Sequence, residues 1–167
     1  RLCFGEISMT QLQSRLMILV LTGFSIASVL GAWGFQYIGG MAPCELCFYQ
    51  RYPHWAAAAF GALAYALCTK LWYYLAALSL LVTSAVGFYH SGIERKWWLG
   101  PESCTSRGAL DPNSLLSMDG PAPALCDEIP WQMFGVTMAN LNAIGSLAIA
   151  VAWIWLARQA VAKRPAA

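Results

Sequence analysis

Charged side chains are scarce in this chain of 167 residues: Asp, Glu, Lys and Arg make up 11%, whereas soluble domains carry about a quarter. Long stretches contain none of them, and the mean hydropathy is positive. This composition argues against a soluble globular domain and favours a lipid environment. The net charge of +2 is too small to indicate nucleic acid as a partner.

Four uncharged apolar stretches approach or exceed the ~20 helical residues that cross a bilayer. We expect membrane spans at about 16–38, 52–69, 71–89 and 129–156. The second stretch is the weakest, because it is short and begins with Pro53 and His54, and the fourth has Pro130 near its start. The predicted fold is an all-α membrane protein: a four-transmembrane-helix bundle forming one domain, 16–157, with a long polar loop at 90–128 and tails at 1–15 and 158–167.

The distribution of Lys and Arg predicts the orientation of these spans. Four spans place both ends of the chain on one side, which carries Arg1, Arg15, Lys70, Arg158, Lys163 and Arg164. The other side carries Arg51, Arg95, Lys96 and Arg107. Basic residues are enriched on the cytoplasmic side, so we expect both tails inside and the loop outside. The first run is too long for the apolar part of a signal peptide and has no small-residue cleavage site, so we expect it to be retained.

The spans also lack Asp, Glu, Lys and Arg, which counts against a small transporter or channel subunit, because such proteins line their path with intramembrane polar groups. Asn140 and Asn142, with Gly135 and Gly145, are interpreted as helix-packing groups in the last span. Residues 93–99 mix aromatic, basic and apolar types. Two interpretations remain open for them: a short interfacial helix, or a tryptophan belt that closes the third span.

The six cysteines divide by predicted side. Cys44 and Cys47 follow the first span, and Cys104 and Cys126 lie in the polar loop, so these four share the outer side. The other two cysteines lie on the inner side: Cys68 near the inner end of the second span, and Cys3 in the inner tail. Oxidising compartments permit disulfides and the cytosol does not. We therefore expect Cys68 and Cys3 to be free thiols without a role.

The sequence Cys44-Glu45-Leu46-Cys47 is a compact redox unit. Its small ring adds little stability as a disulfide, which argues for thiol chemistry. Pro43 suits a helix start, and Arg51 then falls on the face of Cys47, where it favours the thiolate and offers hydrogen-bond donors to a carbonyl oxygen. The alternative for Arg51 is a lipid-headgroup anchor. His90 is preferred over His54 as a site residue only because it should lie at the depth of Cys47.

Two structural alternatives exist for the four outer cysteines. Zinc usually takes two closely spaced ligand pairs, and Cys104 and Cys126 are about twenty residues apart, so we expect no metal. Inert structural disulfides are the other alternative, but a membrane helix bundle has little need of them. The wide Cys104 and Cys126 pair lies in a segment rich in Pro and Gly, where it could approach both a soluble partner and the membrane-edge pair.

The segment Cys44-Glu45-Leu46-Cys47-Phe48-Tyr49-Gln50-Arg51 resembles the C-x-L-C-x-Y-x-R signature of the disulfide bond formation protein B (DsbB) family. The stretch from Tyr89 to Glu94, with Trp97-Trp98 and then Cys104, resembles members of that family with a short loop. The resemblance extends from Leu16 to about Arg164. It includes four spans and both cysteine pairs in order.

The resemblance implies a quinone-dependent, disulfide-forming oxidoreductase of the bacterial inner membrane, with its polar loop in the periplasm. The partner would be a periplasmic thioredoxin-fold oxidase of the DsbA type, and the electron acceptor ubiquinone or menaquinone. Cys104 would form the mixed disulfide with that partner and Cys126 would resolve it. Electrons would pass to Cys44 and Cys47, with Cys47 facing the quinone and Arg51 and His90 beside the ring.

Two features depart from the best-known members of that family. The spacing of Cys104 and Cys126 is short, and the N-terminal extension is unfamiliar. A paralogue of the DsbI type, serving a dedicated partner, therefore remains an alternative. So does a membrane scaffold with structural cysteines.

Overall fold

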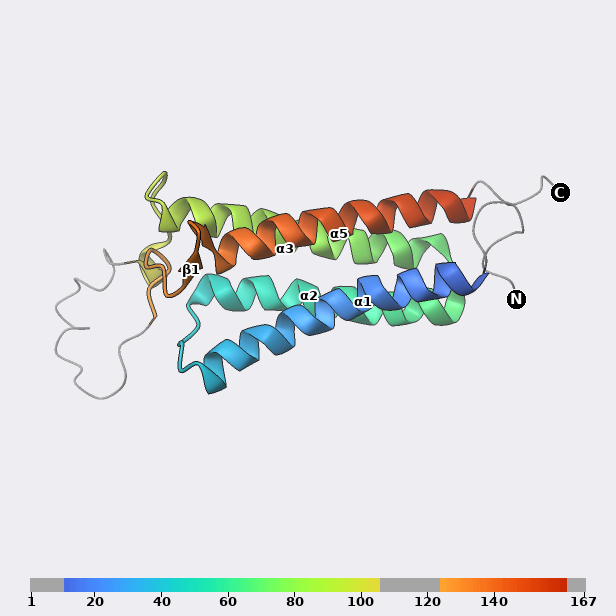
Figure 1. Ribbon diagram of the computed structural model, residues 1–167. Helices are drawn as coiled ribbons and strands as arrows, with labels where there is room; N and C mark the ends of the chain where they lie inside the picture. The colour runs from blue at the N-terminus through green and yellow to red at the C-terminus, as the bar shows by residue number, and fades with distance from the viewer. Residues whose placement is uncertain (1–10, 106–123, 162–167) are drawn as a thin grey trace.

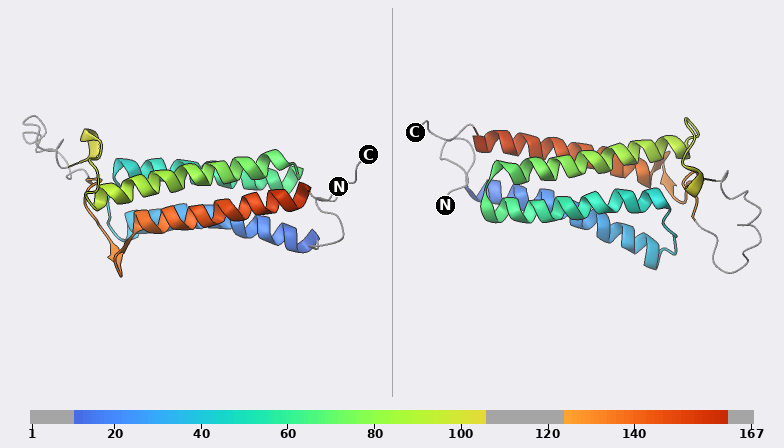
Figure 2. Two further views of the ribbon diagram at one scale, coloured as in Figure 1. Left: turned by 90° about the horizontal axis from the view of Figure 1, so that it is seen from above. Right: turned by 180° about the vertical axis from the view of Figure 1, so that it is seen from behind.

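Four long helices run side by side in the computed structural model, which describes residues 11–105 and 124–161 (Figure 1). They are α1 (Gln11–Trp33), α2 (Glu45–Leu67), α3 (Lys70–Glu94) and α5 (Met138–Val161). Successive helices are antiparallel, so the start of α1, the end of α5 and the turn between α2 and α3 share one end of the bundle (Figures 1 and 2). We call the opposite end the cysteine end, because Cys44, Cys47, Cys104 and Cys126 all lie there.

Short elements complete the cysteine end. A π-helical turn, η1 (Gly34–Ile38), continues α1, and a 3-10 turn, η2 (Glu102–Cys104), precedes the second cysteine pair. The strands β1 (Gln132–Met133) and β2 (Val136–Thr137) form an antiparallel hairpin before α5. Phe134 and Gly135 make its turn with positive φ angles of 51° and 77°, as tight hairpins require.

Three helical segments of the described chain are long and apolar enough to cross a membrane: Leu12–Ile38, Lys70–Glu94 and Met138–Gln159. The prediction of a helical membrane protein is thereby confirmed. α2 has 23 residues but is not among these segments, and its first turns carry Glu45 and Arg51. The count of four spans remains a prediction.

The helix boundaries differ from the predicted stretches. α2 begins at Glu45 rather than at 52, because Cys44 caps the helix and Pro53 is accommodated within it. α3 continues past 89 to Glu94. α5 begins at Met138 rather than at 129, because the hairpin occupies the residues before it. The predicted loop at 90–128 therefore starts inside a helix, and its central part, like most of both tails, lies outside the described residues.

Two buried contacts hold α3 and α5 together. Towards the turn end, Trp153 of α5 and Tyr73 of α3 are fully buried and meet edge to face with their ring centroids 5.8 Å apart. Closer to the cysteine end, α3 and α5 approach so closely at Gly87 that an added Cβ would lie 3.1 Å from Ala143. Lipid supplies no hydrophobic force between helices, so such close packing of small residues is what associates them.

Residues 95–98 fold back over the end of α3 instead of forming an interfacial helix, so that interpretation was wrong. Lys96 reverses the chain with a φ of 58°, and the Trp98 indole donates a hydrogen bond to the Tyr89 carbonyl at 2.9 Å. The Trp98 ring lies against Gly92, where any side chain would overlap it. The indole and the Tyr89 ring are stacked, which agrees with the alternative of an aromatic belt.

Candidate redox site at the cysteine end

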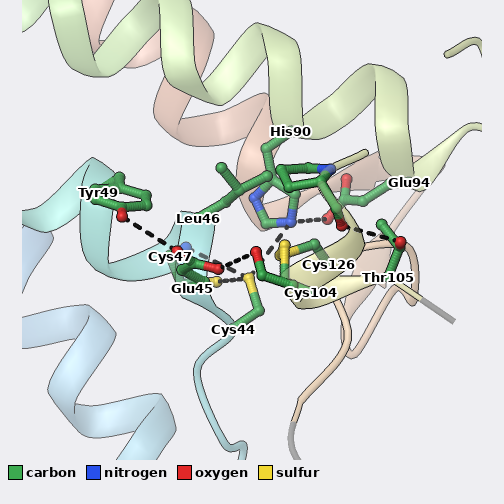
Figure 3. The surroundings of a disulfide bond; sticks show 12 residues. Cys44, Glu45, Leu46, Cys47, Tyr49, His90, Glu94, Cys104, Thr105 and Cys126 are labelled. Atoms are coloured by element: carbon green, nitrogen blue, oxygen red, sulfur yellow. Dashed lines mark hydrogen bonds and ion pairs between the residues drawn. A yellow bond between two sulfur atoms is a disulfide. The ribbon is translucent and has the colours of Figure 1, made fainter. Parts of the chain in front are cut away.

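The two cysteine pairs meet at the cysteine end (Figure 3). Cys104 and Cys126 form a disulfide with their Cα atoms 5.3 Å apart, and both are buried in one apolar cluster with Cys44 and Ile93. Cys44 and Cys47 are thiols. A disulfide and a dithiol therefore lie next to each other, which is the arrangement that thiol–disulfide exchange requires.

Two polar contacts hold the segments of the second pair against the helices. Ser103, next to Cys104, donates a hydrogen bond to the Glu45 carboxylate at the start of α2, at 2.7 Å. Lys96, just beyond α3, binds the Asp127 carboxylate at 2.8 Å. The residues that flank Cys104 and Cys126 thus anchor the disulfide to the ends of α2 and α3, and this is what brings the two pairs together.

The dithiol lies at the helix start that the sequence predicted. Cys44 is the N-cap of α2, and its sulfur accepts a hydrogen bond from the Cys47 amide at 3.4 Å. The two sulfurs are 2.9 Å apart. The hydrogen bond from Cys44 lowers the pKa of Cys47 to about 7, assisted by the Cys44 backbone contact and the Arg51 charge and opposed by burial. The same bond raises the pKa of Cys44. Cys47 is therefore the more acidic thiol of the pair and the one that forms a thiolate more readily.

His90 lies on α3 beside Cys44, with its Nε2 atom 3.6 Å from the sulfur. Gln50 of α2 contacts the other ring nitrogen, Nδ1, at 2.9 Å. Glu94, one turn further along α3, is buried with a carboxylate oxygen 3.9 Å from His90 Nε2, and Thr137 donates a hydrogen bond to it at 2.6 Å. His90 thus contacts the dithiol directly, at the depth that the sequence suggested.

Arg51 is held in place by the end of α1. Its guanidinium donates to the Gln36 side chain at 2.6 Å and to the Ala32 carbonyl at 3.5 Å, and it lies over the Phe48 ring at 5.2 Å. Gln36 belongs to η1, so the π-helical turn that ends α1 presents the group that orients Arg51. The guanidinium is half-buried beside Cys47, where its positive charge favours the thiolate.

A cavity of about 630 Å³ opens beside the dithiol, between α1, α2 and α5. Its wall is mainly apolar, and the groups with redox or hydrogen-bonding chemistry on it include Cys47, Arg51 and His90, with His54 and Asn142 also on the wall. Sites for drug-sized ligands have roughly 300–1,000 Å³ and a similar mix of apolar wall and a few polar groups. The cavity therefore suits a flat, apolar molecule that presents oxygen atoms to Arg51 and Cys47.

The sequence did not indicate several polar residues of this site. The sequence alone assigns no role to Gln36, Gln50 or Glu94, although a polar residue in or next to an apolar stretch can itself indicate a functional site. Asn140 and Asn142 were interpreted as packing groups, but Asn140 binds Arg95 and Asn142 binds Gln50. For Asn142, the interpretation as a packing group missed its hydrogen bond to Gln50, which lies 92 positions earlier and on another helix.

Cys68 corrects another expectation. It was predicted to be a free thiol, but it is disulfide-bonded in the structure. Cys68 is also the C-cap of α2, with a left-handed φ of 54°. It lies at the turn end, far from the redox site, so the correction leaves the four cysteines of the site unchanged. Cys3, for which the same expectation was made, lies outside the described residues.

The family model of disulfide bond formation protein DsbB matches residues 14–156. This chain belongs to the DsbB family. Disulfide bond formation protein B of Shewanella sp. strain ANA-3 and that of strain MR-4 are each 29% identical to it over 145 residues, which cover 76% of this chain and 77% of theirs. No solved structure gives a significant match.

Membership of the DsbB family confirms the resemblance seen in the sequence. The match begins near the start of α1 and ends within α5, so it includes both cysteine pairs and every helix of the bundle. The chain is accordingly a multi-pass membrane protein of a family that forms disulfide bonds, and its cysteine pairs are the groups that can carry such chemistry.

Proposed function

We propose that this protein reoxidises a periplasmic oxidase of the DsbA type and passes the electrons to a membrane quinone. One observation carries the proposal: an apolar cavity opens on Cys47 and Arg51, at a dithiol that lies directly beside the Cys104–Cys126 disulfide. The site therefore contains, side by side, a disulfide that can oxidise the partner, a dithiol next to it, and a cavity that can hold an oxidant.

The proposed reaction moves two electrons per turnover. One partner thiolate attacks the Cys104–Cys126 disulfide, forms a mixed disulfide with Cys104 and releases Cys126 as a thiolate. The second partner thiol then resolves the mixed disulfide, which leaves the partner oxidised and both Cys104 and Cys126 reduced. The resulting dithiol then reduces a Cys44–Cys47 disulfide. Finally, the Cys44–Cys47 pair closes to a disulfide and gives two electrons to the quinone, which takes up two protons, from Cys44 and from solvent, and leaves as the quinol. The structure has the redox states that precede this last step, because the first pair is reduced and the second oxidised.

The site fits a quinone ring in size and chemistry. A quinone is flat and apolar except for two carbonyl oxygens. Arg51 offers planar N–H donors to one such oxygen, and Cys47, with its lowered pKa, supplies a thiolate next to it. Ubiquinone and menaquinone share these features, so either satisfies the proposal. His90 completes the set of residues proposed to bind the acceptor.

Access of the partner requires η2 to move. Cys104 is only 4% exposed, and its sulfur is packed in the apolar cluster. The hydrogen bond of Ser103 to Glu45 and the ion pair of Lys96 with Asp127 lie at the surface, so both can exchange with water at small cost. We propose that the partner displaces these contacts when it forms the mixed disulfide.

The proposed location is the bacterial inner membrane, with the cysteine end in the periplasm and both tails in the cytoplasm. From about residue 52 onward, α2 serves as the fourth span, because it lies alongside α3 (Figure 2). Cys44 and Cys47 then lie ahead of the segment that crosses the membrane, at its periplasmic edge. An oxidising compartment on that side agrees with the disulfide of Cys104 and Cys126.

Purified protein, a reduced thioredoxin-fold oxidase and a soluble short-chain quinone provide the test. Quinone absorbance should fall as the partner is oxidised, with one quinone consumed per partner disulfide formed. Cys47→Ser and Cys104→Ser should each abolish turnover, whereas Cys68→Ser should retain it, because Cys68 lies at the other end of the bundle. Partner oxidation without quinone consumption, or normal turnover in Cys47→Ser, would contradict the proposed electron path.

A further inference from the structure

A series of hydrogen-bonded polar side chains runs from His90 into the interior of the bundle. Gln50 contacts His90 Nδ1 at 2.9 Å, Asn142 contacts the Gln50 amide oxygen at 2.7 Å, and His54 contacts the Asn142 amide oxygen at 2.8 Å. These residues come from α2, α3 and α5. His54, Gln50 and His90 are 3%, 7% and 4% exposed, so their hydrogen bonds are largely shielded from bulk water.

Thr83 fixes the orientation of the Asn142 amide. The Thr83 hydroxyl has a single hydrogen, which it donates to the Gln50 backbone carbonyl at 2.8 Å. The group that faces the same hydroxyl oxygen at 3.0 Å must therefore be a donor, which is the Asn142 NH₂ group. This NH₂ also donates to the Gln50 amide oxygen. The Asn142 oxygen consequently faces His54, and His54 Nε2 has to carry a proton to donate to it.

The Leu46 backbone fixes the orientation of the Gln50 amide in the same way. Its carbonyl oxygen can only accept, and it lies 3.3 Å from the Gln50 side-chain nitrogen. That nitrogen is therefore the NH₂ group, and it donates to His90 Nδ1. The three hydrogen bonds that link these side chains all point one way, from His54 through Asn142 and Gln50 to His90.

The donor-to-acceptor direction of these hydrogen bonds selects one tautomer of His90. Because Nδ1 accepts from Gln50, the proton of the neutral ring has to be on Nε2. This nitrogen faces the Cys44 sulfur at 3.6 Å, and the ring also contacts the Cys126 backbone. A protonated Nε2 has no lone pair for a metal ion, although it lies with both sulfurs of the dithiol inside 4.8 Å. The geometry favours hydrogen bonding to Cys44 over metal binding.

We propose that Gln50, Asn142 and His54 are positioning residues that hold His90 with its Nε2–H directed at the Cys44 sulfur. This inference rests on the proposed function. When the dithiol of Cys104 and Cys126 reduces the Cys44–Cys47 disulfide, Cys44 leaves its mixed disulfide with one of them as a thiolate. The bonding electron pair stays on the Cys44 sulfur, the new disulfide closes between Cys104 and Cys126, and the Nε2–H hydrogen-bonds to the leaving thiolate without transferring its proton.

The substitution Gln50→Glu tests the proposal with almost no change of shape. A carboxylate still accepts from Asn142 but cannot donate to His90, so the ring proton should move from Nε2 to Nδ1. The chain contains only two histidines, so ¹⁵N NMR of protein labelled at histidine shows two imidazoles, and His54→Gln assigns them. Gln132→Glu, the same change at an exposed position of β1, is the matched control.

The expected result has two parts. Wild-type protein and Gln132→Glu should show His90 protonated on Nε2, and Gln50→Glu should show it protonated on Nδ1. The single-turnover transfer from the Cys104 and Cys126 dithiol to the Cys44–Cys47 disulfide, quenched by alkylation without quinone, should slow about tenfold, as expected for one lost hydrogen bond.

Several outcomes would overturn the inference. They are a wild-type His90 protonated on Nδ1, a tautomer that Gln50→Glu leaves unchanged, or a changed tautomer with an unchanged transfer rate. None of these measurements uses quinone. A failure of quinone reduction alone would therefore contradict the proposed function while the tautomer and transfer results still decide this proposal.

Discussion

Arg51 provides the sharpest test of the proposed quinone site, because its guanidinium has two separate effects there. Its guanidinium lies beside Cys47, whose pKa is lowered to about 7, and its charge is one of the causes of that shift. It also projects N–H donors at the cavity wall. Arg51→Ala should therefore raise the pKa of Cys47 and weaken binding of a quinone oxygen at the same time.

The magnitude follows from both effects. A neighbouring opposite charge shifts a pKa by about one unit or more, and we take about one because Arg51 is half-buried and is not the main cause of the shift. The thiolate fraction of Cys47 at pH 7 then falls from about a half to about a tenth. Loss of a charge-assisted hydrogen bond costs about 1.5–3 kcal/mol. This corresponds to roughly a tenfold to hundredfold loss in quinone-dependent turnover.

The pH dependence of quinone reduction shows in which direction Arg51 shifts the pKa of Cys47. The thiolate is the reactive form, so in wild-type protein the rate of quinone reduction should rise as the pH rises through about 7 and then level off. In Arg51→Ala the same rise should occur at higher pH. Arg51→Lys keeps the charge but loses the planar fork, so it should keep the wild-type pH midpoint with a raised quinone KM.

Stopped-flow quinone reduction across a pH series measures both quantities, and thiol alkylation rates report the pKa of Cys47 independently. Arg158→Ala is the matched control, because Arg158 is an exposed arginine in the last turn of α5, at the opposite end of the bundle. Partner exchange through Cys104 should survive in every variant. An unchanged pH midpoint and an unchanged quinone KM in Arg51→Ala would refute this reasoning and leave Arg51 as a lipid anchor.

Two further predictions concern Gln36 and the orientation of the chain. Gln36→Leu should raise the quinone KM about tenfold with little change in the Cys47 pKa. The substitution removes a charge-assisted hydrogen bond that orients Arg51 but leaves the Arg51 charge in place. Equal KM values for wild-type protein and Gln36→Leu in titrations with the short-chain quinone would contradict this prediction. In a background without native cysteines, single cysteines placed at Gln132 and Thr69 should react differently with an impermeant reagent in intact cells. Only the one at Gln132 should be labelled, and labelling at Thr69 alone would invert the proposed topology.

The sequence by itself determined the helical membrane fold and much of the site near Cys47. Uncharged apolar stretches predict helices because helix formation in lipid depends on hydrogen bonds within one contiguous segment. Pro43, Cys44 and Cys47 mark a helix start, and the spacing of four residues places Arg51 on the face of Cys47. These features are local, so they can be read without knowing how the helices pack.

The positions of helix ends were less well determined, because local signals compete with tertiary contacts. The predicted second span begins at 52, next to Pro53, but α2 starts earlier and continues through this proline, and Thr83 of α3 satisfies a backbone carbonyl close to the interruption. The residues before Met138 were included in an apolar span, but positive φ angles at Phe134 and Gly135 close a hairpin there. An apolar composition alone does not distinguish these two structures.

Only the tertiary structure decided which polar groups meet across the bundle. Asn142 faces Gln50 and His54 because α5 is rotated about its axis to present that side to α2, and this rotation is set by packing at contacts such as Gly87 against Ala143. Hydropathy is nearly uniform around each helix, so the sequence carries little information on the rotation. The contact between the two cysteine pairs, and the tautomer proposed for His90 beside them, depend on this packing and could not be derived from spacing along the chain.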